Sequence, residues 1–179
     1  MNNSLPEAEY ITSMDEVLWG GLLITVTMVM HGFGMLAVLR VNLSVKNWVG
    51  ERTHIVANLF PIILASWMIL LVHLTEVVVW AGFFVWKGAF ANRSLSYYFS
   101  LNEYTTVGSN FNLPLHWRLL EGMLATAGLL AFAWSTGILM TLAQEFQDRH
   151  VELFKLRHAK NPGHSPAAPS QGSAKSQKA

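Results

Sequence analysis

Three ionisable side chains fall within long apolar stretches of the sequence, where a charge is costly without a partner. His31 lies in the first stretch, and His73 and Glu76 lie three residues apart in the second, so the last two share one face of a helix. Histidine and glutamate at this spacing can bind a divalent metal ion in helix bundles. They can also form a structural brace, in which a neutral His31 is hydrogen-bonded to Glu76 or to a short neighbouring helix. A pH sensor is a further hypothesis, because histidine titrates near neutral pH. The brace is favoured, because three ligand-type residues are weak evidence for a metal site.

A polar stretch, residues 97–114, separates the second apolar segment from the third. It has the sequence YYFSLNEYTTVGSNFNLP, with aromatic residues first, then two threonines and a Val-Gly step, and a proline at its end. This order predicts a short re-entrant helix that breaks into extended backbone. Non-helical backbone at membrane depth is tolerated only where it is buried in protein or lines a water-filled cavity. One physical use of such backbone is to direct carbonyl oxygens at a dehydrated cation.

The same stretch resembles the pore of potassium channels. The family's filter begins T-T-V-G, as does Thr105-Thr106-Val107-Gly108, and its pore helix carries the aromatic-aromatic-serine pattern seen in Tyr98-Phe99-Ser100. Gly128 lies about where the family's inner helix often has a hinge glycine, and close packing between helices is the alternative role for it. The resemblance covers residues 56–146 and implies an all-α membrane protein with a potassium-channel-like pore domain. It also implies a homotetramer, because a ring of filter carbonyls needs several chains.

The resemblance implies a conduction filter made of Thr105, Thr106, Val107, Gly108, Ser109 and Asn110. The family's Tyr-Gly is replaced by Ser109-Asn110. Asparagine tolerates positive φ, so the backbone path is expected to survive. Serine cannot fill the space of a tyrosine packed behind the filter, so we expect passive conduction of monovalent cations, K⁺ and also Na⁺, with weak selectivity. No resident cofactor is implied.

We call residues 105–110 the filter-like segment. Two polar residues, Asn102 and Glu103, lie just before it. We expect both to support it. The Glu103 carboxylate is placed either to accept hydrogen bonds behind the filter or to face the cavity and attract cations. In the third apolar segment, Glu121 is expected to pair with Arg118.

The elements that position these residues follow from the apolar pattern. The chain of 179 residues is 52% apolar, and its apolar residues come in long runs, which places it in the membrane class. It has no cysteine, so no disulfide framework is expected. We predict a polar arm over 1–16, an extra transmembrane helix over 17–39, and a cytoplasmic loop over 40–54. A pore domain over 55–146 follows, with an outer helix over 56–86, a pore helix and filter over 94–112, and an inner helix over 117–143. A cytoplasmic amphipathic helix over 147–160 and a disordered tail over 161–179 complete the chain. That helix either extends the inner helix or lies on the lipid surface.

Charge distribution predicts the topology. Basic residues occur in the loop 40–54 and after residue 144, whereas the first 16 residues have none. The positive-inside rule therefore predicts an external N-terminus and a cytoplasmic C-terminus. A small, cysteine-free chain that does not begin with a signal-peptide pattern is consistent with a bacterial inner membrane.

Several classes of function are not indicated by the sequence. There is no span with regularly spaced arginines, no phosphate loop, no catalytic motif and no basic stripe, so we expect neither a voltage sensor, an enzyme nor a nucleic-acid-binding protein. The alternative to a channel is a non-conducting pore-fold protein in the lipid bilayer. It would act as a metal sensor, a pH sensor or an accessory subunit through His31, His73 and Glu76.

Overall fold

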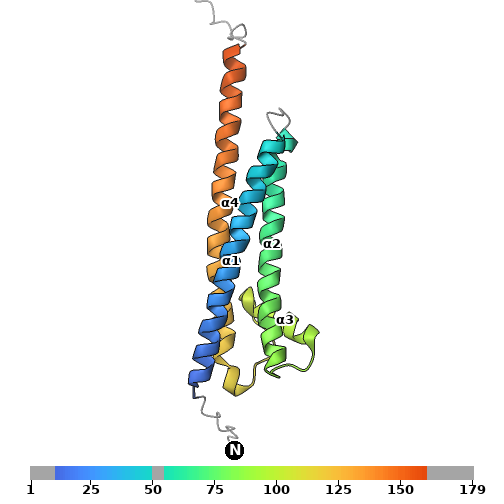
Figure 1. The fold of residues 1–179 in the computed structure, drawn as a ribbon, viewed down its shortest axis with the longest axis vertical. Coiled ribbons are helices and arrows are strands. Elements are labelled where there is room, and N and C mark those ends of the chain that lie inside the picture. The colour runs from blue at the N-terminus through green and yellow to red at the C-terminus, as the bar shows by residue number, and fades with distance from the viewer. Residues whose placement is uncertain (1–10, 50–54, 161–179) are drawn as a thin grey trace, which may run out of the picture. The chain divides into compact units, whose positions relative to one another are not determined.

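The computed structural model describes residues 11–49 and 55–160. Their order along the chain (Figure 1) is α1 (Met14–Val49), α2 (Ile55–Trp86), α3 (Arg93–Tyr104), the short 3₁₀ helix η1 (Leu115–Trp117) and α4 (Leu119–Lys160). No strand occurs in these ranges, and three of their helices are long and apolar enough to cross a membrane: Met14–Lys46, Leu59–Trp86 and Leu115–Glu152. The protein is therefore an all-helical integral membrane protein over the part described.

Helix α1 begins at a capping box, in which side chain and backbone satisfy each other reciprocally. The backbone N–H of Ser13 donates to Glu16 Oε2 (3.0 Å), and the N–H of Glu16 donates to Ser13 Oγ (3.2 Å). The other carboxylate oxygen of Glu16 accepts a hydrogen bond from the N–H of Leu119 (3.1 Å). One buried carboxylate thus serves the first turns of both α1 and α4, where a negative charge is favourable.

The helix ends differ from those expected. The first helix was predicted over 17–39 and a loop over 40–54, but α1 continues to Val49. Residues 40–49 contain neither glycine nor proline, so nothing in the backbone ends the helix where the apolar layer ends. By contrast, α4 runs without a break to Lys160, so residues 147–160 continue the third helix, which is one of the two arrangements expected for them. Residues 1–10, 50–54 and 161–179 lie outside the described part, and with them most of the predicted arm and the whole predicted tail.

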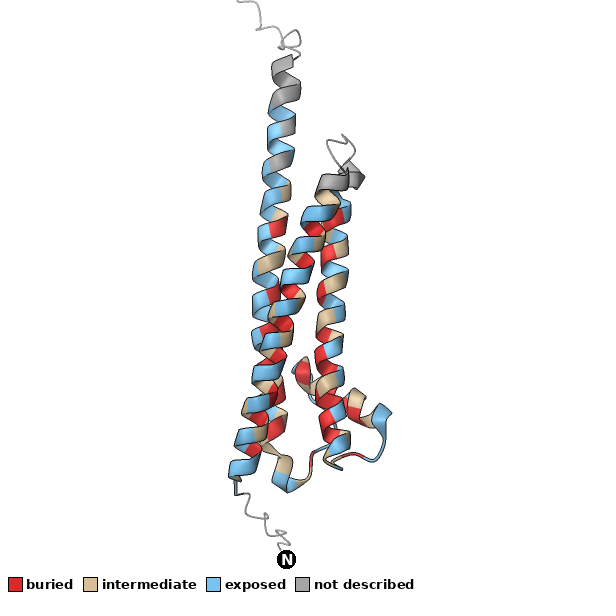
Figure 2. Cartoon of the chain, viewed as in Figure 1, coloured by how far each residue is buried: buried red, intermediate tan, exposed pale blue. Residues whose placement is uncertain are grey.

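The described residues divide into two compact units, the first ending at Ala143 and the second beginning at Gln144. The site lies in the first unit. There α1 and α2 run side by side, and α3 packs against the end of α2 from which it follows (Figure 1). Ser96 Oγ donates to the carbonyl of Ala81 (2.8 Å), which ties α3 to α2. Figure 2 shows the buried residues gathered on the sides of the helices that face one another. The outward apolar side chains are those expected of helices in contact with lipid.

Two glycines allow helices to approach closely, as small residues commonly do in membranes. A Cβ on Gly34 of α1 would collide with the side chain of Val72 of α2, and a Cβ on Gly128 of α4 would collide with the backbone carbonyl of Tyr104, the last residue of α3. The structure therefore gives Gly128 a packing role. Its expected role as a hinge is a separate prediction.

We predict that Gly128→Ala lowers the stability of the folded protein by about 1–3 kcal/mol, because overpacking against fixed backbone costs about that much. Gly122→Ala is the matched control. It lies on the same helix, no neighbouring atom lies within 4 Å of the position that a Cβ would take there, and alanine favours a helix over glycine. Unfolding in detergent micelles measures both variants. Equal stability of the two variants would contradict the close approach of α4 to α3.

Candidate functional site

A cluster of buried polar side chains lies between the membrane-spanning helices and α3. We call it the polar ring. Each member is at most 5% exposed. Its members are His31 from α1, His73 and Glu76 from α2, Tyr104 from α3 and Ser135 from α4.

Hydrogen-bond contacts connect the members in a closed circuit. Nδ1 of His31 lies 2.9 Å from Oε1 of Glu76. The hydroxyl of Tyr104 donates to Oε2 of Glu76 (2.5 Å) and lies 2.8 Å from Nδ1 of His73. Oγ of Ser135 lies 3.0 Å from Nε2 of His73 and 3.2 Å from Nε2 of His31. Each side chain contacts the next, and the last returns to the first.

Tyr104 joins the ring to the end of α3. Burial raises the pKa of its hydroxyl above the usual value, and the hydrogen bond to Glu76 raises it further. Tyr104 therefore keeps its proton near neutral pH, and its hydroxyl donates a hydrogen bond to Glu76. Because Tyr104 is the last residue of α3, this bond also holds the point at which the helix gives way to the filter-like segment.

Aromatic rings cover the polar ring on the side of α4. Phe132 stacks on His73 with ring centroids 4.4 Å apart, and the centroid of Trp134 lies 5.5 Å from that of His31. Nearby, Nε1 of Trp80 donates to the hydroxyl of Thr27 (2.9 Å). These rings keep water from the ring's hydrogen bonds, which strengthens those bonds and makes an unpartnered group there costly.

The predicted metal ligands meet in space, with candidate ligand atoms of His31, His73 and Glu76 within 4.8 Å of one another. The His31 and Glu76 atoms, however, lie only 2.9 Å apart and face each other directly. A tetrahedral site with metal–ligand distances of about 2.0–2.1 Å separates its ligands by about 3.3 Å. A bound ion would have to displace the existing hydrogen bonds, so the geometry favours the brace interpretation, including its predicted His31–Glu76 contact.

After α3, the backbone N–H groups of residues 106–109 all point back toward the end of that helix. This arrangement uses both of the residues predicted to support the filter, Asn102 through its backbone and Glu103 through its backbone and side chain. The bonds run from Thr106 N to Glu103 O (2.9 Å), from Val107 N and Gly108 N to Asn102 O (2.9 and 3.2 Å), and from Ser109 N to Glu103 Oε1 (2.9 Å).

The direction of these N–H groups determines the direction of the carbonyls. In a planar trans peptide the C=O points opposite to the N–H of the following residue. The carbonyl oxygens of residues 105–108 therefore all point away from α3. Thr106 has φ 60° and Gly108 has φ 77°, and Thr106 is the only non-glycine residue at positive φ in the described part. A β-branched residue in that region is strained, and such strain is typical of functional segments.

The conformation changes after Gly108. Asn110 was expected to keep the filter path by taking a positive φ, but it has none. Instead, Oγ of Ser109 donates to the carbonyl of Phe111 (2.7 Å), which closes a local turn. The small polar side chain at position 109 allows this turn, and the hydrogen bonds of the backbone N–H groups establish the common carbonyl direction as far as Gly108.

The segment after the turn is joined to α4 by Glu121. Its Oε1 accepts a hydrogen bond from the N–H of Leu113 (2.7 Å) and lies 3.8 Å from Nε of Arg118. The expected ion pair with Arg118 is therefore present, but at a longer distance than the bond to the loop. Glu121 holds the returning loop against the start of the third membrane-spanning helix.

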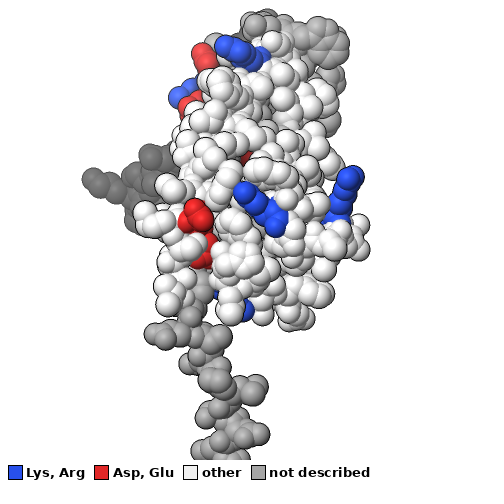
Figure 3. All heavy atoms as spheres, turned by 60° about the horizontal axis from the view of Figure 1, so that its bottom comes forward, with Lys and Arg blue, Asp and Glu red and all other residues white. Residues whose placement is uncertain are grey.

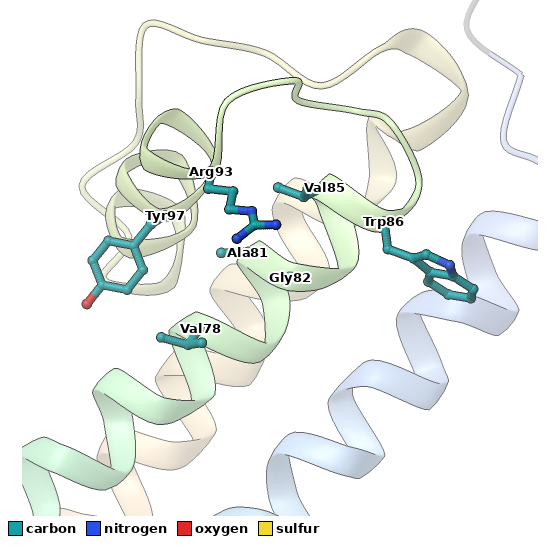
Figure 4. A pocket seen from close by; sticks show the side chains of 7 residues that line it. All are labelled: Val78, Ala81, Gly82, Val85, Trp86, Arg93 and Tyr97. Atoms are coloured by element: carbon teal, nitrogen blue, oxygen red, sulfur yellow. The ribbon is translucent and has the colours of Figure 1, made fainter.

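An apolar groove of about 460 Å³ lies along α2 and α3, apart from the ring and the filter-like segment (Figure 4). Its one charged lining residue is Arg93, at the first turn of α3. Figure 3 shows that the surrounding end of the molecule is largely uncharged, with basic side chains that stand apart from one another. These features suit a surface in contact with lipid or with another chain. The groove is lined by Val78, Ala81, Gly82, Val85, Trp86, Arg93 and Tyr97.

Two members of the ring were not anticipated. Tyr104 follows Glu103 directly, and its signal was a hydroxyl at the end of the predicted re-entrant helix. No feature of the sequence indicated that Ser135 belongs to the ring. Serine in a membrane helix commonly bonds the carbonyl four residues earlier, as Ser135 does with Ala131 (2.9 Å).

Comparisons with protein-family models, with curated proteins and with solved structures gave no match.

We predict that Tyr104→Phe lowers stability by about 1–3 kcal/mol, because it leaves buried atoms of Glu76 and His73 without their partner. Tyr98→Phe is the matched control on the same helix, since Tyr98 is 54% exposed, and it should change stability little. Thermal unfolding in detergent tests both variants. If Tyr104→Phe lowers stability no more than Tyr98→Phe does, the hydrogen bonds of Tyr104 do not stabilise the ring.

Proposed function

We propose that this protein is a subunit of a passive cation channel with a potassium-channel-like pore. The carbonyl oxygens of residues 105–108 replace water around the permeant ion, and the Thr106 hydroxyl lies at the inner entrance. One observation carries the proposal: four successive peptide groups turn their N–H to α3 and their C=O away from it. A row of carbonyls with one direction is what cation coordination by backbone requires.

The proposed channel is a homotetramer. One chain supplies one column of oxygens, whereas a carbonyl filter needs several columns around an axis. In an isolated chain the segment would also be left open, with the Val107 side chain 75% exposed. Carbonyl groups facing lipid would be costly, and neighbouring copies around a water-filled axis remove that cost.

The proposed selectivity is weak, with K⁺ and Na⁺ both permeant. The common carbonyl direction is established as far as Gly108, and the turn at Ser109 replaces the further carbonyl layers that a longer filter would have. Fewer successive coordination sites give less discrimination between ions of equal charge. The filter faces the outside, with an external N-terminus and a cytoplasmic C-terminus, in a bacterial inner membrane.

The second candidate is a non-conducting pore-fold protein that senses protons or a metal, or that acts as an accessory subunit. The observation that favours its proton-sensing form is the polar ring, in which two buried histidines contact Glu76, Tyr104 and Ser135. Ion flux distinguishes it from the channel.

We predict that Gly108→Ala reduces K⁺ flux into liposomes by about tenfold or more. Alanine at φ 77° is strained by about 1–2 kcal/mol, which turns the carbonyls at this position. Gly122→Ala, in an open position on α4, should leave flux unchanged. Flux that survives Gly108→Ala at the wild-type rate would contradict the proposed path.

We also predict that Glu103→Leu makes the channel less selective, because it removes the acceptor that holds the Ser109 N–H. Glu103→Gln keeps an oxygen at that place and should behave as the wild type. Reversal potentials with K⁺ on one side and Na⁺ on the other give the permeability ratio. A ratio unchanged in Glu103→Leu would show that this bond does not support the filter.

A further inference from the structure

The polar ring has five contacts between its members, and each contact has room for one proton. His31, His73, Glu76 and Tyr104 are the titratable groups that face it, from α1, α2 and α3. From α4 the ring receives the uncharged Ser135 and the aromatic faces of Phe132 and Trp134. Because these groups are buried, the number of protons they share determines whether every contact is a hydrogen bond.

Five protons satisfy the ring with no net charge. Tyr104 and Ser135 bring one each, and the two histidines and Glu76 share three. These three make either a neutral acid with two neutral imidazoles or a carboxylate with one imidazolium and one imidazole. In both cases the Ser135 hydroxyl donates to the Nε2 of one histidine and accepts from the other.

A sixth proton is also accommodated, because Ser135 has a further acceptor outside the ring. Its Oγ lies 2.9 Å from the carbonyl of Ala131, one turn earlier on α4. When the hydroxyl donates there, its oxygen accepts from Nε2–H of both histidines. Both imidazoles are then protonated beside the Glu76 carboxylate, and every contact remains a hydrogen bond at a net charge of +1.

We propose that the polar ring is a buried proton-binding site with two fully hydrogen-bonded states that differ by one proton, and that the Ser135 hydroxyl turns between them. The proton taken up from water resides on a histidine nitrogen. At the same step the Ser135 hydroxyl keeps its proton but stops donating to a histidine nitrogen. It donates to the carbonyl of Ala131 instead. No other group has to move by more than a hydroxyl rotation.

This site is coupled to the end of α3 through Tyr104, which contacts both Glu76 and His73. The next peptide groups are those that direct the carbonyls of the filter-like segment. Through this contact, the number of protons bound to the ring controls conduction. That consequence rests on the proposed channel function, and the rest of the inference does not.

The test is a ¹⁵N NMR titration of the reconstituted full chain. Two of the seven histidines lie in the ring, so replacing the other five with glutamine leaves only the signals of His31 and His73. As the pH of the sample is lowered from about pH 8 to about pH 5, both signals should end, in one step, as those of doubly protonated imidazoles.

The variants that decide the role of Ser135 differ by one hydroxyl. Ser135→Ala should keep one histidine singly protonated over the same range, and Ser135→Thr should restore the concerted step. Thr136→Ala is the matched control. Its hydroxyl is on the next residue, exposed, and makes the same kind of bond to a helix carbonyl (2.8 Å to Phe132). It should titrate as the wild type does.

The proposal is overturned if the wild-type signals do not depend on pH, or if Ser135→Ala titrates as the wild type does. It is also overturned if added Zn²⁺ shifts both signals at fixed pH, since the ring would then be a metal site. Flux into liposomes at the two ends of the pH range provides the separate test of coupling. No flux in any variant, with an intact NMR titration, would reject the channel and leave the proton site in place.

Discussion

A carboxylate inside the membrane is the constraint on which this structure depends. Glu76 is fully buried, and a buried charge without partners is among the most costly features a membrane protein can contain. The chain satisfies it with His31 from α1 and Tyr104 from α3. Meeting the needs of one side chain therefore specifies how three segments of the chain pack together, and Ser135 brings in a fourth through the histidines.

The same constraint extends to the filter-like segment. Tyr104 is held at the end of α3 by Glu76, and Gly128 allows α4 to approach the Tyr104 carbonyl closely. The preceding residues, Asn102 and Glu103, are thereby placed to accept the N–H groups that follow. The aligned carbonyls are thus the far end of a chain of contacts that starts in the membrane interior, which explains how a threonine can be kept at positive φ.

Hydropathy was sufficient to predict the membrane-spanning helices, because each needs a long apolar run. It did not predict that α1 extends to Val49, because hydropathy reports the apolar layer and a helix continues until its backbone is interrupted. The continuation of α4 to Lys160 was one of two arrangements that the helical spacing allowed. The His31–Glu76 contact was predictable, since an isolated intramembrane charge demands a partner. The contacts of Tyr104 and Ser135 were not predictable, because a neutral hydroxyl does not need a charged partner.

The proposed channel requires aligned carbonyls from several copies to surround one axis. A cryo-EM reconstruction of the protein in lipid nanodiscs with K⁺ present would show this arrangement directly. We expect a four-fold assembly, by analogy with carbonyl filters, in which the oxygens of residues 105–108 face ion density on the axis. A particle in which Val107 and Gly108 lie against lipid, or in which a single chain stands alone, would contradict it.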